Sequence, residues 1–123
     1  PPSRVDLALR EARSCYDHLA GRIAVAIADG LVREGAVLLD PDGGTVTEKG
    51  EAVLAEIGLD VAALRPTPHL LPPLAGSVGE GLFRRMTEIG WFATERHSRA
   101  VAVTPAGRAG LAERFGVTFG DRL

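Results

Sequence analysis

The chain contains two copies of one sequence pattern, about 55 residues apart within its 123 residues. Residues 19–23 (Leu-Ala-Gly-Arg-Ile) return as residues 74–78 (Leu-Ala-Gly-Ser-Val), and the Val-Thr-x-x-Gly of residues 46–50 returns at residues 103–107. The other matches are mainly apolar residues and glycines: Ile27 and Leu82, Leu31 and Met86, Gly35 and Gly90, Val37 and Phe92, Ala52 and Ala109, Leu54 and Leu111, Ala55 and Ala112, Glu56 and Glu113. A repeat kept at such positions usually preserves a packing unit. We therefore expect a duplicated structural module, with any function located where the two copies differ.

In the first copy, four apolar residues recur at intervals of four: Leu19, Ile23, Ile27 and Leu31. This stripe predicts a helix that ends near residue 34, with Gly35 in the left-handed position that follows a helix end. Residues 36–46 combine a short apolar run, a tip of turn formers and a second extended stretch, which predicts a β-hairpin. Thr47 is then expected to cap a helix that runs to residue 57.

The second copy follows the same order. Its helix stripe is Leu74, Val78, Leu82 and Met86. Gly90 is expected to end this helix, and residues 91–93 are expected to pair with residues 100–103 as a second hairpin. Thr104 is the predicted cap of a last helix that runs to about residue 115, with Pro105 at the first helical position, where its missing N–H costs nothing.

These elements predict an α+β fold, and their order resembles the back half of a winged-helix domain, so we expect a winged-helix-like architecture. We expect an N-terminal helical segment over residues 1–18, a first helix–hairpin–helix module over residues 19–60, and a second over residues 74–123, with approximate twofold symmetry. A proline-rich connector over residues 61–73 joins them, since four prolines in residues 65–73 make a stiff, extended segment. The modules are expected to form one compact domain.

The composition is that of a soluble globular protein, with 46% hydrophobic and 24% charged residues. No apolar run approaches the roughly 20 residues that cross a bilayer, so no membrane partner is expected. The one cysteine, Cys15, cannot form an internal disulfide, which fits a reducing compartment. We expect a cytoplasmic protein.

Two segments resemble a known group of regulators. Residues 104–108 (Thr-Pro-Ala-Gly-Arg), placed after two short strands, look like the start of the helix that follows the wing in winged-helix domains. Residues 12–22 (Ala-Arg-Ser-Cys-Tyr-Asp-His-Leu-Ala-Gly-Arg) resemble the segment that follows the DNA-binding domain in a group of bacterial ArsR-type transcriptional regulators. In that group the Cys-Tyr-Asp-His-Leu-Ala-Gly string opens a C-terminal region of two related halves, and the resemblance covers most of residues 10–115.

The chain departs from that group in two ways. The second half normally begins with its own cysteine-containing segment, and here residues 65–73 take that place. The N-terminal winged helix is also absent from the sequence, which begins at Pro1. We expect an excised C-terminal domain, the alternative being a short relative with another role.

Cys15 and His18 are three residues apart, so on a helix they would share a face and could both bind a soft metal. A metal site needs a third ligand, from His69, His97 or a partner subunit, and a buried cysteine beside a backbone-bonded histidine is the simpler interpretation. A nucleophilic Cys–His pair would need an orienting group and an oxyanion site that the sequence does not display. We therefore predict no metal, no cofactor and no enzyme.

The largest apolar side chains of the second copy are Trp91 and Phe92, which follow the helix end. Packing in the core explains them. The alternative is a cleft between the modules that binds a small apolar or aromatic effector. Its predicted lining is Cys15, Tyr16, His18, Trp91 and Phe92.

The net charge of −2 is divided unevenly, with seven Lys or Arg against eleven Asp or Glu in residues 1–73, and seven against five in residues 74–123. The candidate DNA contacts are five arginines: Arg84, Arg85, Arg96, Arg99 and Arg108. A solvated surface explains this modest surplus equally well. Each module also lacks the tight helix–turn–helix that places a recognition helix in the major groove.

The resemblance implies the effector-sensing or dimerisation domain of a winged-helix transcriptional regulator, with DNA read mainly by a separate N-terminal domain. Apolar faces left over from half-domains favour a homodimer. Two alternatives remain open: a stand-alone winged-helix-like module that binds DNA or protein, and a small enzyme on the same scaffold.

Overall fold

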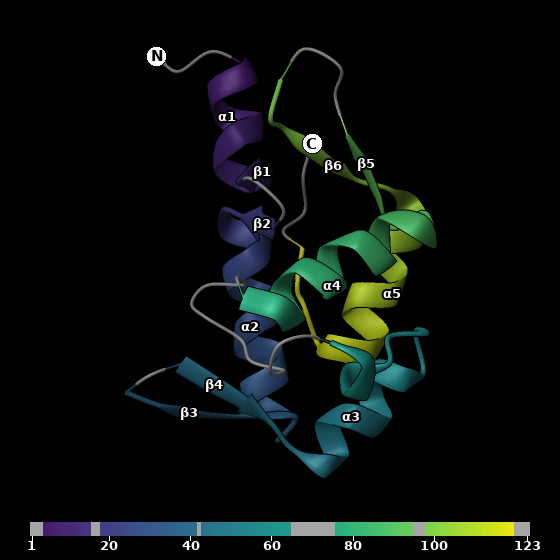
Figure 1. Cartoon of the computed structure of the whole chain (residues 1–123). Helices are drawn as coiled ribbons and strands as arrows, with labels where there is room; N and C mark the ends of the chain where they lie inside the picture. The colour runs from purple at the N-terminus through teal and green to yellow at the C-terminus, as the bar shows by residue number, and fades with distance from the viewer. Residues whose placement is uncertain (1–3, 16–17, 42, 65–75, 95–97, 120–123) are drawn as a thin grey trace.

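The computed structural model describes residues 4–15, 18–41, 43–64, 76–94 and 98–119 (Figure 1). The helices are α1 (Arg4–Glu11), α2 (Arg22–Arg33), α3 (Glu48–Ala55), the 3₁₀ helix η1 (Val61–Ala63), α4 (Gly76–Glu88) and α5 (Pro105–Phe115). The strands are β1 (Arg13–Cys15), β2 (His18–Ala20), β3 (Val37–Asp40), β4 (Gly43–Val46), β5 (Phe92–Thr94) and β6 (Val101–Val103). They pair as three antiparallel hairpins, and the α+β, winged-helix-like fold class is confirmed. No helix in the described part of the chain is long and apolar enough to cross a membrane.

The helix ends and caps of the two copies have the same geometry. After α2, Gly35 has a φ of 77°, and the N–H of Ala36 donates to the carbonyl of Leu31 at 2.9 Å. After α4, Gly90 has a φ of 82°, and the N–H of Trp91 donates to Met86 at 2.8 Å. Both are Schellman-type helix ends, as the two glycines predict.

A threonine then joins each helix end to the next helix start. The hydroxyl of Thr104 donates to the carbonyl of Gly90 at 2.5 Å and accepts from the N–H of Gly107 at 3.0 Å. Thr47 makes the matching bonds in the first copy, at 2.7 Å and 3.0 Å. Both threonines are the N-caps predicted from the sequence.

Several element boundaries differ from the sequence prediction. Helix α3 ends at Ala55 rather than residue 57, because the chain turns there into the left-handed Gly58, which has a φ of 87°. Strand β5 begins at Phe92 rather than Trp91, because the backbone N–H of Trp91 is used at the end of α4.

The helix predicted to start at Leu19 is wrong in its first turn. Residues 13–15 pair with residues 18–20 as β1 and β2, and α2 starts after Gly21, which has a φ of 100°. The hairpin is held by distant backbone groups: the N–H of Ser14 donates to Arg99 at 2.8 Å, and the N–H of Val101 donates to Ala12 at 3.0 Å. This pairing with the second module overrides the helical periodicity of the local sequence.

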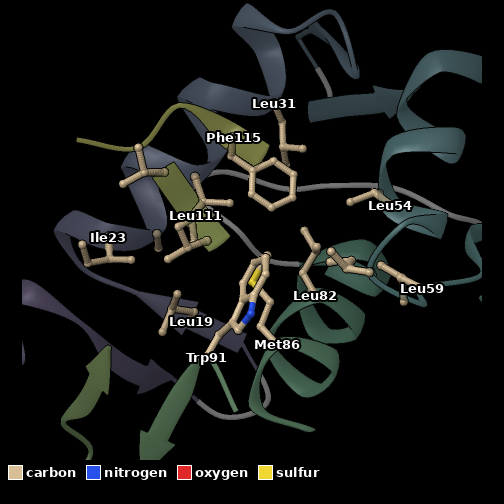
Figure 2. Packing of buried hydrophobic residues seen from close by; sticks show 14 of the residues in the cluster. Leu19, Ile23, Leu31, Leu54, Leu59, Leu82, Met86, Trp91, Leu111 and Phe115 are labelled. Atoms are coloured by element: carbon tan, nitrogen blue, oxygen red, sulfur yellow. The ribbon is translucent and has the colours of Figure 1, made fainter. Parts of the chain in front are cut away.

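The core is formed by side chains of both copies. Figure 2 shows Leu31 beside Phe115, with Leu111 and Trp91 between elements of the two modules. Ile23, Leu31, Leu82, Leu111 and Phe115 have no exposed surface. The β3–β4 and β5–β6 hairpins lie at opposite ends of the molecule (Figure 1).

Candidate functional site

Trp91 is fixed by both its backbone and its ring. Its N–H is bonded to Met86, and its carbonyl accepts from the N–H of Thr104 at 3.0 Å. The indole meets the ring of Phe115 edge-on, with centroids 6.4 Å apart, and lies directly over Gly110, where a Cβ would overlap it. Trp91 is therefore a rigid wall, 8% exposed, between α4 and α5.

Among the contacts between the modules, two are related by the repeat, and we call these the two junctions. In each, the first helix of one module (α2 or α4) reaches the end of the last helix of the other (α5 or α3). In one junction, α2 lies against the end of α5, so close that a Cβ on Gly30 would overlap the carbonyl oxygen of Phe115. Arg33 donates from Nη2 to the carbonyls of Phe115 and Gly116, both at 3.2 Å. This junction is closed by direct backbone packing.

In the second junction, Arg85 of α4 occupies the position that matches Gly30 in the repeat. Its Nε donates to the carbonyl of Ile57, just beyond α3, at 2.6 Å. Its Nη1 pairs with Glu88 at 3.4 Å. A long side chain thus bridges the helices here, whereas a glycine brings them into contact in the first junction.

An open pocket of about 340 Å³ lies at this second junction. Its walls come from the end of α3, from α4 and from α5. It is lined by Ala55, Glu56, Ile57, Gly58, Arg85, Ile89, Trp91 and Arg114. The pocket is apolar where Trp91 and the isoleucines line it, and charged at its rim.

The rim carries an ion pair between the two modules. Arg114 of α5 donates from Nη1 to Oε1 of Glu56 at 2.8 Å. Both side chains are open to solvent, 38% and 61% exposed, so the pair contributes on the order of 0–1 kcal/mol to stability. Such a pair can exchange partners at little cost.

The predicted effector residues are only partly brought together. Trp91 lines the pocket, but Phe92 is buried elsewhere, with its ring 6.1 Å from that of Phe83. Core packing, the simpler interpretation, holds for Phe92 and also for Trp91, which belongs to the same buried cluster. Tyr16 lies outside the described residues, as do the side chains of Cys15 and His18.

The helix face predicted for Cys15 and His18 is wrong. The two residues are paired across β1 and β2, which run antiparallel. Among the described residues, no group of three metal-ligating side chains is found. His69 and His97, the predicted third ligands, lie outside the described part.

The five candidate DNA contacts have different surroundings. Arg84 and Arg99 are exposed, and the backbone carbonyl of Arg99 accepts from Ser14. Arg85 lines the pocket, and Arg108 lies over the ring of Phe119, 4.7 Å from its centroid. Arg96 lies outside the described residues.

Sequence reasoning missed most of the pocket. Glu56 and Arg114 are 58 residues apart and meet only because the ends of α3 and α5 converge. The charge of Arg85 marks it only as a candidate DNA contact. Its place opposite Gly30 in the repeat is a usable signal that the two copies differ there. Nothing in the sequence marked Glu56 or Ile89 as site residues.

No family model matches the chain, and no solved structure matches it. The chain is 28% identical over 120 residues to a Bacillus subtilis (strain 168) protein described as the uncharacterized HTH-type transcriptional regulator YdfF. This similarity relates the chain to a transcription regulator. The match covers 89% of the chain but 53% of that protein, so the chain spans about half the length of the curated relative. Similarity to a regulator also argues against an enzyme.

Proposed function

We propose that this chain is the effector-sensing and self-associating part of an ArsR-like transcriptional regulator of the cytoplasm, in which a separate segment reads the DNA. The observation that carries the proposal is the match to a regulator about twice as long as the matched region. A longer relative leaves room for a DNA-reading segment outside the matched half.

The connections between the helices support the assignment of DNA reading to a separate segment. Between α1 and α2, α2 and α3, and α4 and α5, the chain forms a hairpin, and residues 56–75 separate α3 from α4. A helix–turn–helix joins its two helices by a turn of only about three or four residues. No pair of consecutive α-helices in the described part of the chain is joined in that way, and the helix that follows α3 after residues 56–60 is η1, a 3₁₀ helix of three residues.

Effector sensing is supported by the pocket at the second junction. A ligand there contacts α3 of one module and both α4 and α5 of the other, so it favours the arrangement of modules that it fits. Trp91 is the one tryptophan of the chain and lines the pocket, so its emission reports binding.

Self-association is supported by apolar side chains left in solvent. Val25 and Val32 are seven residues apart on α2, hence on the same face, and are 48% and 37% exposed. Leu38 and Leu39 of β3 are 64% and 63% exposed. Exposed apolar groups on neighbouring elements are typical of interfaces, and a homodimer is the simplest assembly that covers the α2 face with one of the two leucines, since successive strand residues face opposite sides.

A second candidate function is direct DNA or protein binding by the chain alone. Arg84 and Arg99 are exposed and free of ion pairs within the described residues, so they are available to phosphates. A small enzyme on this scaffold remains third.

The experiment is selection of duplexes from a random-sequence library by the purified chain, followed by mobility shifts at low and high ionic strength. We expect that salt-sensitive retention, where it occurs, enriches no sequence. Enrichment of a defined site that is lost in an Arg84→Gln, Arg99→Gln variant would overturn the proposal in favour of direct DNA reading.

A further inference from the structure

We propose that the pocket at the second junction binds the carboxylate of a small aromatic or apolar acid, with Arg114 and Arg85 as the carboxylate partners. The inference rests on the proposed effector sensing and names the chemical class of the effector. It follows from the charges at the rim, the apolar wall and the asymmetry of the repeat.

The apolar part of the pocket suits a ring or a short hydrocarbon. Trp91, Ile57 and Ile89 face it, and its volume of about 340 Å³ lies within the usual range for small-molecule sites. Trp91 is held rigidly, so this wall is already formed before a ligand arrives. Little conformational entropy is lost when a flat ring packs there.

Arg114 supplies the first anion contact. In the structure its guanidinium is bonded to the carboxylate of Glu56, which is 61% exposed. A ligand carboxylate replaces Glu56 with the same charge and the same bond geometry, while Glu56 returns to water. An arginine is suited to this exchange because its planar guanidinium can donate to either carboxylate.

Arg85 supplies the second contact. Its Nε and Nη1 are bonded to Ile57 and Glu88, whereas Nη2 has no partner among the described residues. Nη2 lies beside Gly58, where a Cβ would be 2.6 Å from it. Arg85 and Gly58 both line the pocket, and Gly58 has no side chain that would cover this N–H group.

The repeat explains why the site occurs at this junction. At the matching place in the first junction, Gly30 lets the backbone of Phe115 pack against α2, and no room is left for a ligand. At the equivalent position in the second junction, Arg85 provides a positively charged side chain, and space is left beside it for a ligand. The change from Gly30 to Arg85 therefore creates both the space and part of the charge.

A neighbouring pocket has charged lining residues of the opposite sign. It shares Ala55 and Gly58 with the first, and its charged lining residues are Glu51 and Asp60. A cationic ligand is therefore favoured on that side of Gly58 and an anionic one on the Arg114 side.

The test is a titration of the 123-residue chain with phenylacetate and with its neutral isostere phenylacetamide, followed by Trp91 emission up to about 20 mM, the range expected for a ten-atom fragment. We expect saturable binding of phenylacetate, and binding of phenylacetamide about tenfold weaker or more. Arg114→Gln should weaken phenylacetate binding about tenfold. Glu56→Gln should tighten it about two- to fivefold, because it removes the internal competitor.

Two exposed residues provide charge-matched controls. Arg84→Gln on α4 and Glu113→Gln on α5 make the same changes of net charge outside the pocket, and both should leave the affinity within about twofold of the parent. Equal binding of phenylacetate and phenylacetamide would overturn the carboxylate class while leaving effector sensing in place. Absence of any Trp91 response to phenylacetate, or an unchanged affinity in Arg114→Gln, would overturn the site itself. None of these results affects the outcome of the DNA-selection experiment, which tests the proposed function separately.

Discussion

Gly107 packs directly against the carbonyl of Trp91, so closely that a Cβ on Gly107 would overlap the carbonyl oxygen. Gly50 has the same relation to Ala36 in the first copy. The repeated Thr-x-x-Gly is therefore one structural device. Its threonine binds the preceding helix end, and its glycine lets the next helix lie against that end.

Replacement of Gly107 by alanine should destabilise the protein by about 1–3 kcal/mol, because the new methyl group has to displace a backbone carbonyl. The sign is the informative part, since Gly→Ala inside a helix ordinarily stabilises by roughly 0.5–1 kcal/mol. Urea unfolding followed by circular dichroism measures the change. Gly90→Ala is the comparison: it has open space but a φ of 82°, so about 1 kcal/mol of backbone strain alone is expected. A neutral or stabilising Gly107→Ala would contradict the close packing.

Loss of the threonine hydroxyl should weaken each module. Thr104→Val and Thr47→Val remove a cap that both donates and accepts, and each should cost about 1–2 kcal/mol in the free energy of unfolding. Serine keeps the hydroxyl and should recover most of that loss. If valine and serine variants unfold at the same urea concentration, the caps do not contribute as the bonds indicate.

Arg33 and Arg85, which donate to backbone carbonyls of the other module, should stabilise the packing of the modules on one another. Arg33→Met removes the donor to Phe115 and Gly116, and Arg85→Met removes the donor to Ile57; each should cost about 1 kcal/mol. The two sites share no partner, so their effects should add within about 0.5 kcal/mol in the double variant. Arg84→Met on the exposed side of α4 is the control and should fall within about 0.5 kcal/mol of the parent. Equal effects at Arg33 and Arg84 would argue that the junction bond is not formed in solution.

Charges on the exposed face of α2 should prevent self-association. Sedimentation equilibrium is expected to show a dimer for the parent chain and a monomer for Val25→Lys, Val32→Lys, because two lysines cannot be buried unpaired in an interface. Ala109→Lys, on the exposed side of α5, introduces a charge elsewhere and should leave the dimer intact. A monomeric parent, or a double variant that still dimerises, would remove α2 as the interface.

The parts of the fold that follow from local hydrogen bonding could be predicted from the sequence. A glycine at a helix end and a threonine before a helix each act within a few residues, so Gly90 and Thr104 were sufficient to place the helix end and the cap. The β1–β2 hairpin could not be found in that way. Its residues continue a helical apolar stripe at Leu19, and its partners Arg99 and Val101 are more than 80 residues away in sequence.

Some features of the candidate site could likewise be predicted from the sequence, and others depend on the tertiary structure. Trp91 could be singled out from its size and its place after a helix end, and the resemblance to a regulator came from residues 12–22. The pocket depends on the convergence of α3 and α5, which brings Glu56 to Arg114. The sequence alone determined that two similar modules form, since the repeated glycines and threonines act on their own neighbours. Only the tertiary structure decided that the two junctions differ, because Gly30 and Arg85 are equivalent in the repeat but pack against different helix ends.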